Sequence, residues 1–272
     1  RHPPLWRLNK MSPVYQFSRG DSPLLVSMPH VGLEVPPAIA AQFSLPALTL
    51  PDTDWHVERL YDFLPEMGAS TIQANYSRYV VDLNRSPDTG HSLYPGQNVT
   101  QICTTTLFDQ QPVYQTDCEP TSDQIADRIE QYWHPYHQQL RAELTRIKDQ
   151  FGYALLWDAH SIRSQVPRFF SGKLADFNWG NADGIACSNQ LTDRLQASTT
   201  RSSNYTSVVN GRFKGGYITR TYGRPAQNIY AIQLELSQDT YMYDHRNFCE
   251  DRAARVRPLL KILLKQILTD HR

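Results

Sequence analysis

The feature that most constrains the fold is an apolar run, Tyr153-Ala154-Leu155-Leu156-Trp157, that ends in Asp158-Ala159-His160-Ser161. The run has the length and composition of a buried strand, and its polar end would lie at the rim of a sheet. In open α/β sheets, ligands bind at that rim, outside the carboxyl ends of the strands. Imidazole is a common metal ligand and a common general base, although a strand-end histidine can also only cap a loop. The rest of the chain must therefore decide the role of His160.

The segments around this run predict alternating strands and helices. A long helix is predicted from Thr121 to about Lys148, and Thr121 and Gln124 suit a capping box at its start. Because this helix stands between two strands, it suits a crossover in a largely parallel sheet. The other predicted strands are 24–28, 70–74, 79–83, 207–209 and 229–236, and the other helices are 52–64, 190–196 and 246–268, the last with a kink at Pro258. This order predicts an α/β fold.

Composition excludes several classes of protein. The chain has 272 residues, which suits one α/β domain over 1–272, and its 27 basic and 27 acidic residues balance. We therefore expect neither nucleic-acid nor membrane binding. No apolar run is long enough to span a bilayer, and Arg1–Lys10 lacks the apolar core of a signal peptide. The cysteines show no CxxC spacing, which indicates reduced thiols in a cytoplasmic protein, with a Cys103–Cys118 disulfide as the alternative: Cys103, Cys118, Cys187 and Cys249.

Four predicted strand ends carry reactive side chains. They are His30, Asn84-Arg85, His160 and Glu235. A parallel sheet would place all four along one edge, and two histidines with a carboxylate form a usual catalytic zinc set. The remaining ligand is expected within 52–58, where the candidates are Asp54, His56 and Glu58. Glu235 would then be free to act as general base on water.

Each of these residues also has a structural interpretation. A lone histidine such as His30 more often has a structural role, and Asn84-Arg85 could form a turn with an exposed cation. Glu235 is harder to explain in this way, because a buried carboxylate is costly unless it is paired or its pKa is shifted. The histidines of the long helix, His134 and His137, are assigned to surface or core positions, because no acidic partner there supports a metal site.

Six segments, in order along nearly the whole chain, resemble the N-formylglutamate amidohydrolases, also called N-formylglutamate deformylases. One such segment would be weak support, but six in the same order are specific. The segments are Ser27-Met28-Pro29-His30-Val31-Gly32, Pro51-Asp52-Thr53-Asp54-Trp55-His56, Ser77-Arg78-Tyr79-Val80-Val81-Asp82-Leu83-Asn84-Arg85, Trp157-Asp158-Ala159-His160-Ser161, Phe213-Lys214-Gly215-Gly216-Tyr217-Ile218-Thr219-Arg220 and Gln233-Leu234-Glu235-Leu236-Ser237-Gln238-Asp239-Thr240-Tyr241-Met242.

That family is similar to zinc carboxypeptidases and aspartoacylases. The resemblance implies a three-layer α/β/α sandwich with a mixed, mostly parallel sheet, and zinc bound by His30, His160 and a carboxylate. It also implies that Glu235 activates water and that Asn84-Arg85 grips a substrate carboxylate. The chain departs from the carboxypeptidase spacing His-x-x-Glu, because Leu33 stands where that glutamate would be. We therefore expect Asp54 as the carboxylate ligand, with Glu58, Asp52 and Glu34 as alternatives.

The implied reaction is the hydrolysis of N-formyl-L-glutamate to L-glutamate and formate, the last step of a histidine-degradation route. The alternative is a related zinc amidohydrolase or peptidase that acts on another N-acyl amino acid. The implied cofactor is one Zn²⁺ per chain, or another divalent metal. A small dicarboxylate substrate calls for arginines, because guanidinium pairs carboxylates bidentately. Beyond Arg85, the candidates are Arg78, Arg220, Arg163 and Arg168, and the long loop 86–120 is expected to close over the substrate.

Overall fold

The computed structural model of the chain describes residues 12–88 and 100–270. The strands of this part form a seven-stranded sheet in the order β1-β3-β2-β4-β7-β5-β6. Their bounds are β1 Tyr15–Ser18, β2 Leu24–Met28, β3 Ser70–Ala74, β4 Ala154–Ile162, β5 Phe177–Gly180, β6 Ser207–Val209 and β7 Ile229–Ser237. The strands β3, β2, β4 and β7 run parallel to one another, β1 and β5 join them antiparallel, and β6 is parallel to β5. The prediction of a mixed, mostly parallel sheet is confirmed.

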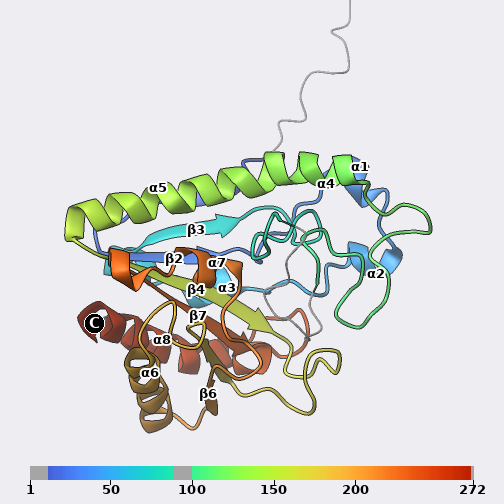
Figure 1. Ribbon diagram of the computed structural model, residues 1–272. Helices are drawn as coiled ribbons and strands as arrows, with labels where there is room; N and C mark the ends of the chain where they lie inside the picture. The colour runs from blue at the N-terminus through green and yellow to red at the C-terminus, as the bar shows by residue number, and fades with distance from the viewer. Residues whose placement is uncertain (1–11, 89–99, 271–272) are drawn as a thin grey trace, which may run out of the picture.

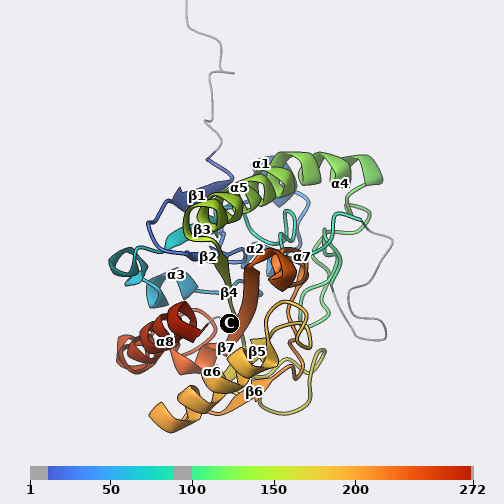
Figure 2. The ribbon, with the colours of Figure 1, turned by 60° about the vertical axis from the view of Figure 1, so that its left-hand side comes forward.

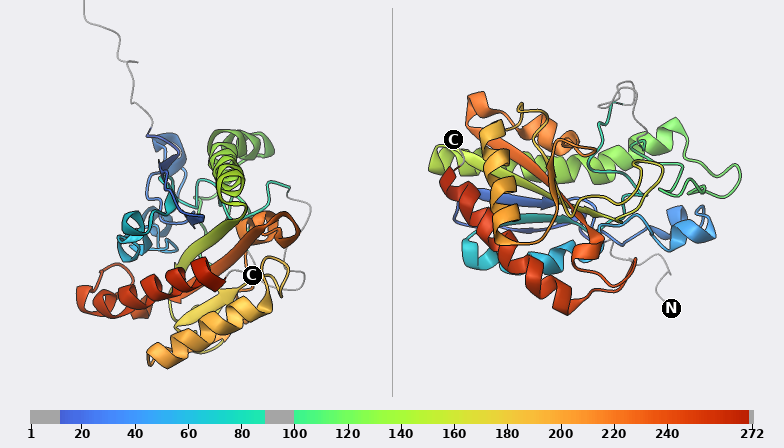
Figure 3. Two further views of the ribbon diagram at one scale, coloured as in Figure 1. Left: turned by 90° about the vertical axis from the view of Figure 1, so that its left-hand side faces the viewer. Right: turned by 90° about the horizontal axis from the view of Figure 1, so that it is seen from below.

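Helices cover both faces of the sheet, which gives the predicted three-layer α/β/α arrangement (Figure 1). The long helix α5 lies over one face, and α6 and α8 lie over the other (Figure 2 and Figure 3). The helices of the described residues are α1 Pro37–Ala40, α2 Leu45–Leu48, α3 Val57–Leu60, α4 Ser122–Arg128, α5 His134–Phe151, α6 Asn189–Ser202, α7 Tyr217–Tyr222 and α8 Glu250–Asp270. Shorter turns are the 3₁₀ turns η1 Leu64–Met67, η3 Pro225–Gln227 and η4 Gln238–Thr240, and the π-helical turn η2 Ile129–Trp133.

The central strand β4 is apolar on both sides because both sides are covered by helices. Leu155 and Trp157 pack into the core that contains α6 and α8, whereas Ala154 and Leu156 pack into the core beneath α5. Side chains alternate between the faces of a strand, so Asp158 and His160 follow Leu156 on the α5 side. The polar residues at the end of the strand therefore lie on the same face as Ala154 and Leu156, beyond the edge of the core beneath α5.

The connection from β3 to the long helix differs from the prediction. Residues 79–83 are not a strand: Val80 N donates to Ser77 O at 2.9 Å in a turn, and Asp82 N donates to Ile102 O at 2.7 Å. The apolar run Tyr79–Leu83 is buried, but by packing under the loop rather than by pairing in the sheet. An apolar run indicates burial, but burial alone does not distinguish a strand from a buried turn. The prediction of a strand over 79–83 was therefore wrong.

The predicted helix within 52–64 is also much shorter than expected. Only Val57–Leu60 form α3, followed by the 3₁₀ turn η1. His56, directly before α3, has φ 61°, a left-handed conformation that a helix cannot contain. By contrast, the long helix begins with the predicted capping box of Thr121 and Gln124. The closing helix α8 begins at Glu250 rather than 246 and includes Pro258.

Other expectations concern the chain as a whole. The four cysteines are free thiols, so the Cys103–Cys118 disulfide is excluded. Within the described ranges, no helix combines the length and apolarity needed to cross a membrane. Part of the long loop, residues 89–99, lies outside the described residues, and so does Arg1–Lys10. The single domain over 1–272, the likeness to zinc carboxypeptidases and the closing of the loop stay predictions.

Candidate active site

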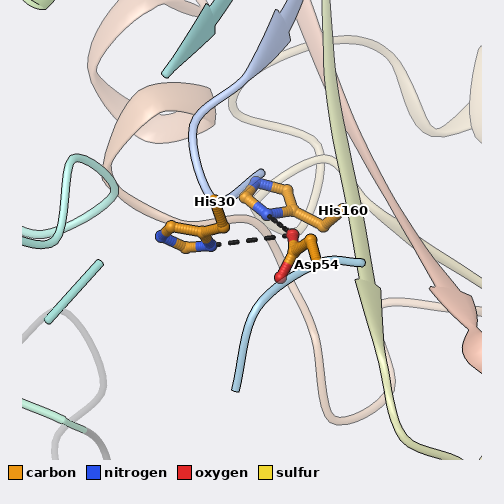
Figure 4. A group of neighbouring side chains, drawn as sticks. All are labelled: His30, Asp54 and His160. Atoms are coloured by element: carbon orange, nitrogen blue, oxygen red, sulfur yellow. Dashed lines mark hydrogen bonds and ion pairs between the residues drawn. The ribbon is translucent and has the colours of Figure 1, made fainter. Parts of the chain in front are cut away.

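Two histidines and one aspartate meet at the carboxyl end of the parallel strands (Figure 4). His30 follows β2, His160 lies near the end of β4, and Asp54 lies on the segment before α3. One nitrogen of each imidazole and one oxygen of Asp54 all lie within 4.8 Å of one another, and all three residues are buried. The backbone fixes the third member, because Asp54 N donates to His30 O at 3.1 Å.

Both imidazoles turn the same ring nitrogen toward Asp54. The distances from Asp54 Oδ2 are 3.0 Å to His160 Nδ1 and 3.7 Å to His30 Nδ1. The opposite nitrogen, Nε2, lies 2.7 Å from Asp82 Oδ1 in His30 and 3.0 Å from Asp158 Oδ2 in His160. A carboxylate behind each imidazole is the usual outer partner of a metal-binding histidine, because it fixes the ring and its tautomer. The donor set therefore suits a divalent metal bound through both Nδ1 atoms and Asp54.

The local charge also favours a cation. Burial raises the pKa of Asp54, but the bonds to His160 and His30 outweigh it and hold that pKa well below its usual range. Burial opposes a charged His160, yet Asp158 and Asp54 raise its pKa well above the ordinary value. A field that holds a proton on a buried imidazole is a field that favours positive charge. The same position would favour a metal ion in place of that proton.

The other candidate ligands lie elsewhere. Asp52 is buried but accepts hydrogen bonds from Tyr79 Oη at 2.6 Å and from Phe108 N at 2.9 Å, and it supports the neighbouring loop. Glu34 is exposed. His56 points away, with Nε2 2.7 Å from Arg246 O, and Glu58 lies within α3. Of the described residues, only Asp54 completes the group with the two histidines.

Glu235 stands beside His160 on the neighbouring parallel strand. The β4–β7 register pairs the two residues directly, so their side chains leave the same face of the sheet. Glu235 lines one pocket together with all three donors. Burial raises the pKa of Glu235 to about 8, and the neighbouring His160 opposes the rise. A carboxyl group with this pKa exchanges protons near neutral pH, as a general acid–base must.

Asn84 and Arg85 reach the same pocket from the turn, not from a strand. Asn84 N donates to Asp82 Oδ1 at 2.9 Å, and Asn84 Oδ1 accepts from Ile218 N of α7 at 2.9 Å. Space is tight here, since a Cβ at Gly216 would lie 2.4 Å from Asn84 Nδ2. The Arg85 guanidinium is oriented by Thr100, whose carbonyl accepts from Nε at 2.9 Å. The Arg85 side chain is thus held by neutral partners, whereas Asn84 Nδ2 lies 3.2 Å from His160 Nε2 and 3.5 Å from Asp158 Oδ2.

The long helix secures this turn from behind. Trp133 Nε1 donates to Arg85 O at 3.0 Å, and His137 Nε2 donates to Leu83 O at 2.8 Å. The two rings stack with centroids 3.7 Å apart, and His137 Nδ1 lies 2.9 Å from the Tyr222 hydroxyl. The π-helical turn ends at Trp133, and such turns often occur near functional sites. His137 is therefore a core residue, as predicted, and it fixes the segment that carries Asn84 and Arg85.

Comparisons with known proteins identify the family of the chain. The sequence model of a family described as N-formylglutamate amidohydrolase matches residues 22–242. The chain belongs to this family. It is 48% identical over 260 residues to an N-formylglutamate deformylase of Pseudomonas putida, covering 95% of this chain and 97% of that protein. An N-formylglutamate deformylase of Pseudomonas aeruginosa shows the same identity and coverage.

Solved structures with a similar fold include a member of the same family. A crystal structure of an N-formylglutamate amidohydrolase from Ralstonia eutropha has a TM-score of 0.80 at 25% identity, covering 94% of this chain and 97% of that one. A gene product of Agrobacterium tumefaciens has a TM-score of 0.69 at 16% identity, covering 95% and 96%, and supports the fold alone. The α/β fold and the hydrolase class of the chain follow from this membership.

The predicted arginines of this amidohydrolase divide into two groups. Arg78 and Arg85 line the pocket. Of the described residues, Arg163, Arg168 and Arg220 are not among those that line it. Arg163 lies 3.4 Å from Asp52 Oδ1, Arg168 donates to Leu107 O at 2.7 Å, and Arg220 donates from Nε to Gly215 O at 2.8 Å. These three side chains support the loops around the pocket.

Sequence reasoning missed several residues of the site. Asp82 and Asp158 stand behind the histidines, and the signal for Asp158 was present, because residues two apart on a strand share a face. Arg212, Phe169 and Phe213 line the pocket from loops, and no sequence periodicity marks such residues. The pocket thus has one wall that the sheet builds and another that the loops build.

Proposed function

We propose that the protein hydrolyses the formamide C–N bond of N-formyl-L-glutamate and releases L-glutamate and formate. The observation that carries the proposal is the meeting of Glu235 with the His30–Asp54–His160 group in one pocket. The 48% identity to two N-formylglutamate deformylases supports the choice of substrate. The position of this reaction at the end of a histidine-degradation route is proposed from the family resemblance, and the cytoplasm as its location from the number and spacing of the cysteines.

We further propose that His30, Asp54 and His160 hold one divalent metal ion, with zinc as the first choice. Two imidazoles and a carboxylate with an open fourth position are the usual ligands of catalytic zinc. A metal bound there would supply Lewis acidity toward the formyl oxygen and toward water. Asp82 and Asp158 would hold the two imidazoles in the tautomer that leaves both Nδ1 atoms available.

Glu235 is the general base in this proposal. Its carboxylate takes a proton from the attacking water, and the resulting carboxylic acid gives a proton to the leaving amine nitrogen. Burial favours the protonated form of Glu235, and His160 favours the ionised form, so both states are accessible near neutral pH. A single carboxyl group can therefore serve both halves of the reaction.

The pocket suits an anionic substrate. Arg78 and Arg85 line it, and Asn84 adds an amide beside Arg85. Arg78 also pairs with Asp82 at 2.8 Å and lies 3.9 Å from Asp54, so it orients the carboxylates of the site. Arg85 and Asn84 are then the first choice for a substrate carboxylate, because guanidinium binds carboxylate in a bidentate fashion.

The test pairs metal analysis with formate release, for the wild type and Glu235→Gln. We expect about one zinc per chain in both proteins and formate release from N-formyl-L-glutamate in the wild type alone. The rate of formate release should be about 10²–10⁴-fold lower in the glutamine variant, the usual contribution of a general base. If both proteins hold metal but the wild type acts only on other N-acyl amino acids, the proposed substrate is wrong and the proposed metal site stands. Activity that survives both chelator and Glu235→Gln would overturn the proposal.

A further inference from the structure

We infer that Arg212 is the residue that selects a carboxylate on the side chain of the substrate. Resting on the proposed function, this inference names what makes the pocket prefer glutamate to neutral amino acids. Arg212 lies on the loop between β6 and α7, and it lines the same pocket as Glu235 and the three metal donors.

The residues that line the pocket fall into two chemical groups. One group is polar and includes the metal donors, Glu235, Asn84 and Arg85. The other consists of the apolar side chains Phe108, Ile162, Phe169 and Phe213. The guanidinium of Arg212 lies over Phe169 and Phe213, and that of Arg78 lies over Phe108. All four apolar residues belong to one small hydrophobic cluster, which also contains Val166, Leu174 and Phe170. A ligand that fits both groups has a polar reacting end, a short apolar arm and an anion at the far end of that arm.

Arg212 is held in a defined orientation. Its Nε donates to Phe169 O at 2.8 Å, and its guanidinium carbon lies 5.3 Å from the Phe169 ring centroid and 5.5 Å from that of Phe213. Stacking on aromatic rings suits the planar, weakly hydrated guanidinium and lowers the entropy lost when it binds a carboxylate. An arginine held in this orientation also favours a carboxylate over a neutral amide, because guanidinium pairs a carboxylate bidentately.

The arginines of the pocket can be assigned by where they lie. The substrate carries two carboxylates, and Arg78 lies on the metal-donor side of the pocket, 2.8 Å from Asp82 and 3.9 Å from Asp54. Arg85 is oriented by Thr100 beside Asn84, in the polar group. Because the two methylenes of the glutamate side chain need apolar contact, we place that side chain among the phenylalanines and its γ-carboxylate on Arg212. The α-carboxylate then belongs to Arg85 and Asn84.

The experiment compares three substrates in three proteins. The substrates are N-formyl-L-glutamate, its γ-amide N-formyl-L-glutamine and its α-amide N-formyl-L-isoglutamine, and the readout is kcat/KM for formate release. The proteins are the wild type, Arg212→Gln and Arg168→Gln. Arg168 is the matched control, because its guanidinium lies over the same Phe169 ring at 5.4 Å but does not line the pocket.

We expect Arg212→Gln to lower kcat/KM for N-formyl-L-glutamate about 100-fold, within the range for the loss of one partner of a hydrogen-bonded charge pair. The value for the γ-amide should change by less than about threefold, because that substrate has no charge to lose. The ratio between glutamate and glutamine substrates should therefore collapse in Arg212→Gln and stay as in the wild type in Arg168→Gln. Arg212→Lys keeps the charge and should restore part of the ratio.

Other outcomes overturn the inference. An equal loss on glutamate and its γ-amide would mean that Arg212 supports the fold or binds the α-carboxylate, and the α-amide separates these two cases. An unchanged ratio in a well-folded Arg212→Gln would exclude any role in selection. Failure of the wild type on all three substrates would instead overturn the proposed function. The two failures are therefore distinguishable in one data set.

Discussion

The two walls of the pocket are built in different ways. The metal-donor wall (His30, Asp54 and His160) is buried, and two of its three members sit on or directly after neighbouring parallel strands. The carboxylate wall (Arg85 and Arg212) comes from a turn and a loop and depends on carbonyl groups and aromatic rings for its orientation. Sheet-borne groups hold a fixed geometry for the chemistry, whereas loop-borne groups can differ between enzymes that use the same chemistry on other substrates.

The largest expected effect tests the metal-donor wall. Asp54→Asn keeps the shape of the side chain but removes the charge that faces both Nδ1 atoms. We expect the metal affinity to fall by more than about 100-fold, because loss of an outer partner alone costs about 10–100-fold. Elemental analysis after dialysis should then find little metal in the variant. Formate release should fall with it.

Asp52→Asn provides the matched control for that change. Asp52 is a buried carboxylate two residues away that bonds to Tyr79 and Phe108 rather than to the histidines. Its variant should keep the metal, even if the protein becomes less stable. If Asp52→Asn lost the metal and Asp54→Asn kept it, the carboxylate ligand would be Asp52, and the metal-donor wall as defined here would be wrong.

The next effect concerns the anchor of the carboxylate wall, His137. Burial lowers the pKa of this histidine to about 3, against 6.5 for the ordinary side chain. Below pH 6.5 the unfolded chain takes up a proton that the folded protein does not, so acid destabilises the folded state by about 1.4 kcal/mol per pH unit until the pH nears 3. The loss should reach about 3 kcal/mol at pH 4.5.

His137→Gln isolates this contribution. A glutamine amide can donate to Leu83 O and accept from Tyr222, as the neutral imidazole does, but it does not titrate. The free energy of unfolding, measured in urea at pH 7.5 and pH 4.5, should fall about 3 kcal/mol more in the wild type than in the variant. Metal release in acid affects both proteins and cancels in the difference. Parallel pH dependences would show that His137 takes up a proton without unfolding.

The smallest expected effect is that of Trp133→Phe. The change removes the hydrogen bond to Arg85 O and keeps an aromatic ring over His137. Loss of one such bond is worth about 1 kcal/mol, so KM for N-formyl-L-glutamate should rise about threefold to tenfold. Because the metal-donor wall is untouched, kcat should change by less than about twofold. A fall in kcat at constant KM would show that the two walls are coupled.

Much of the metal-donor wall could be predicted from the sequence. His30, His160 and Glu235 lie on or directly after apolar runs of a length that marks a strand, and parallel strands bring their carboxyl ends to one edge. Asp54 required the family resemblance, because nothing in the local pattern separates it from Asp52 or Glu58. Their difference lies in the fold of the segment before α3, where His56 takes a left-handed conformation.

The carboxylate wall was predicted only in part. Asn84 and Arg85 reach the pocket as expected, although the segment before them is a turn and not a strand. Arg212 could not be found, because the packing of Phe169 and Phe213 around it joins loops that are distant in sequence. Periodicity describes single elements, whereas a loop takes its place from contacts that no single element determines.

The register of β4 against β7 has a consequence for how the protein folds. A shift of one residue would turn either His160 or Glu235 to the other face, so the donors and the base meet only in the native register. The strands β2, β4 and β7 come from widely separated parts of the chain, and pairings of this kind form slowly because long loops must close first. We therefore expect the reactive centre to be assembled late, after the strands have reached their native alignment. A misaligned folding intermediate would lack hydrolytic activity from the start.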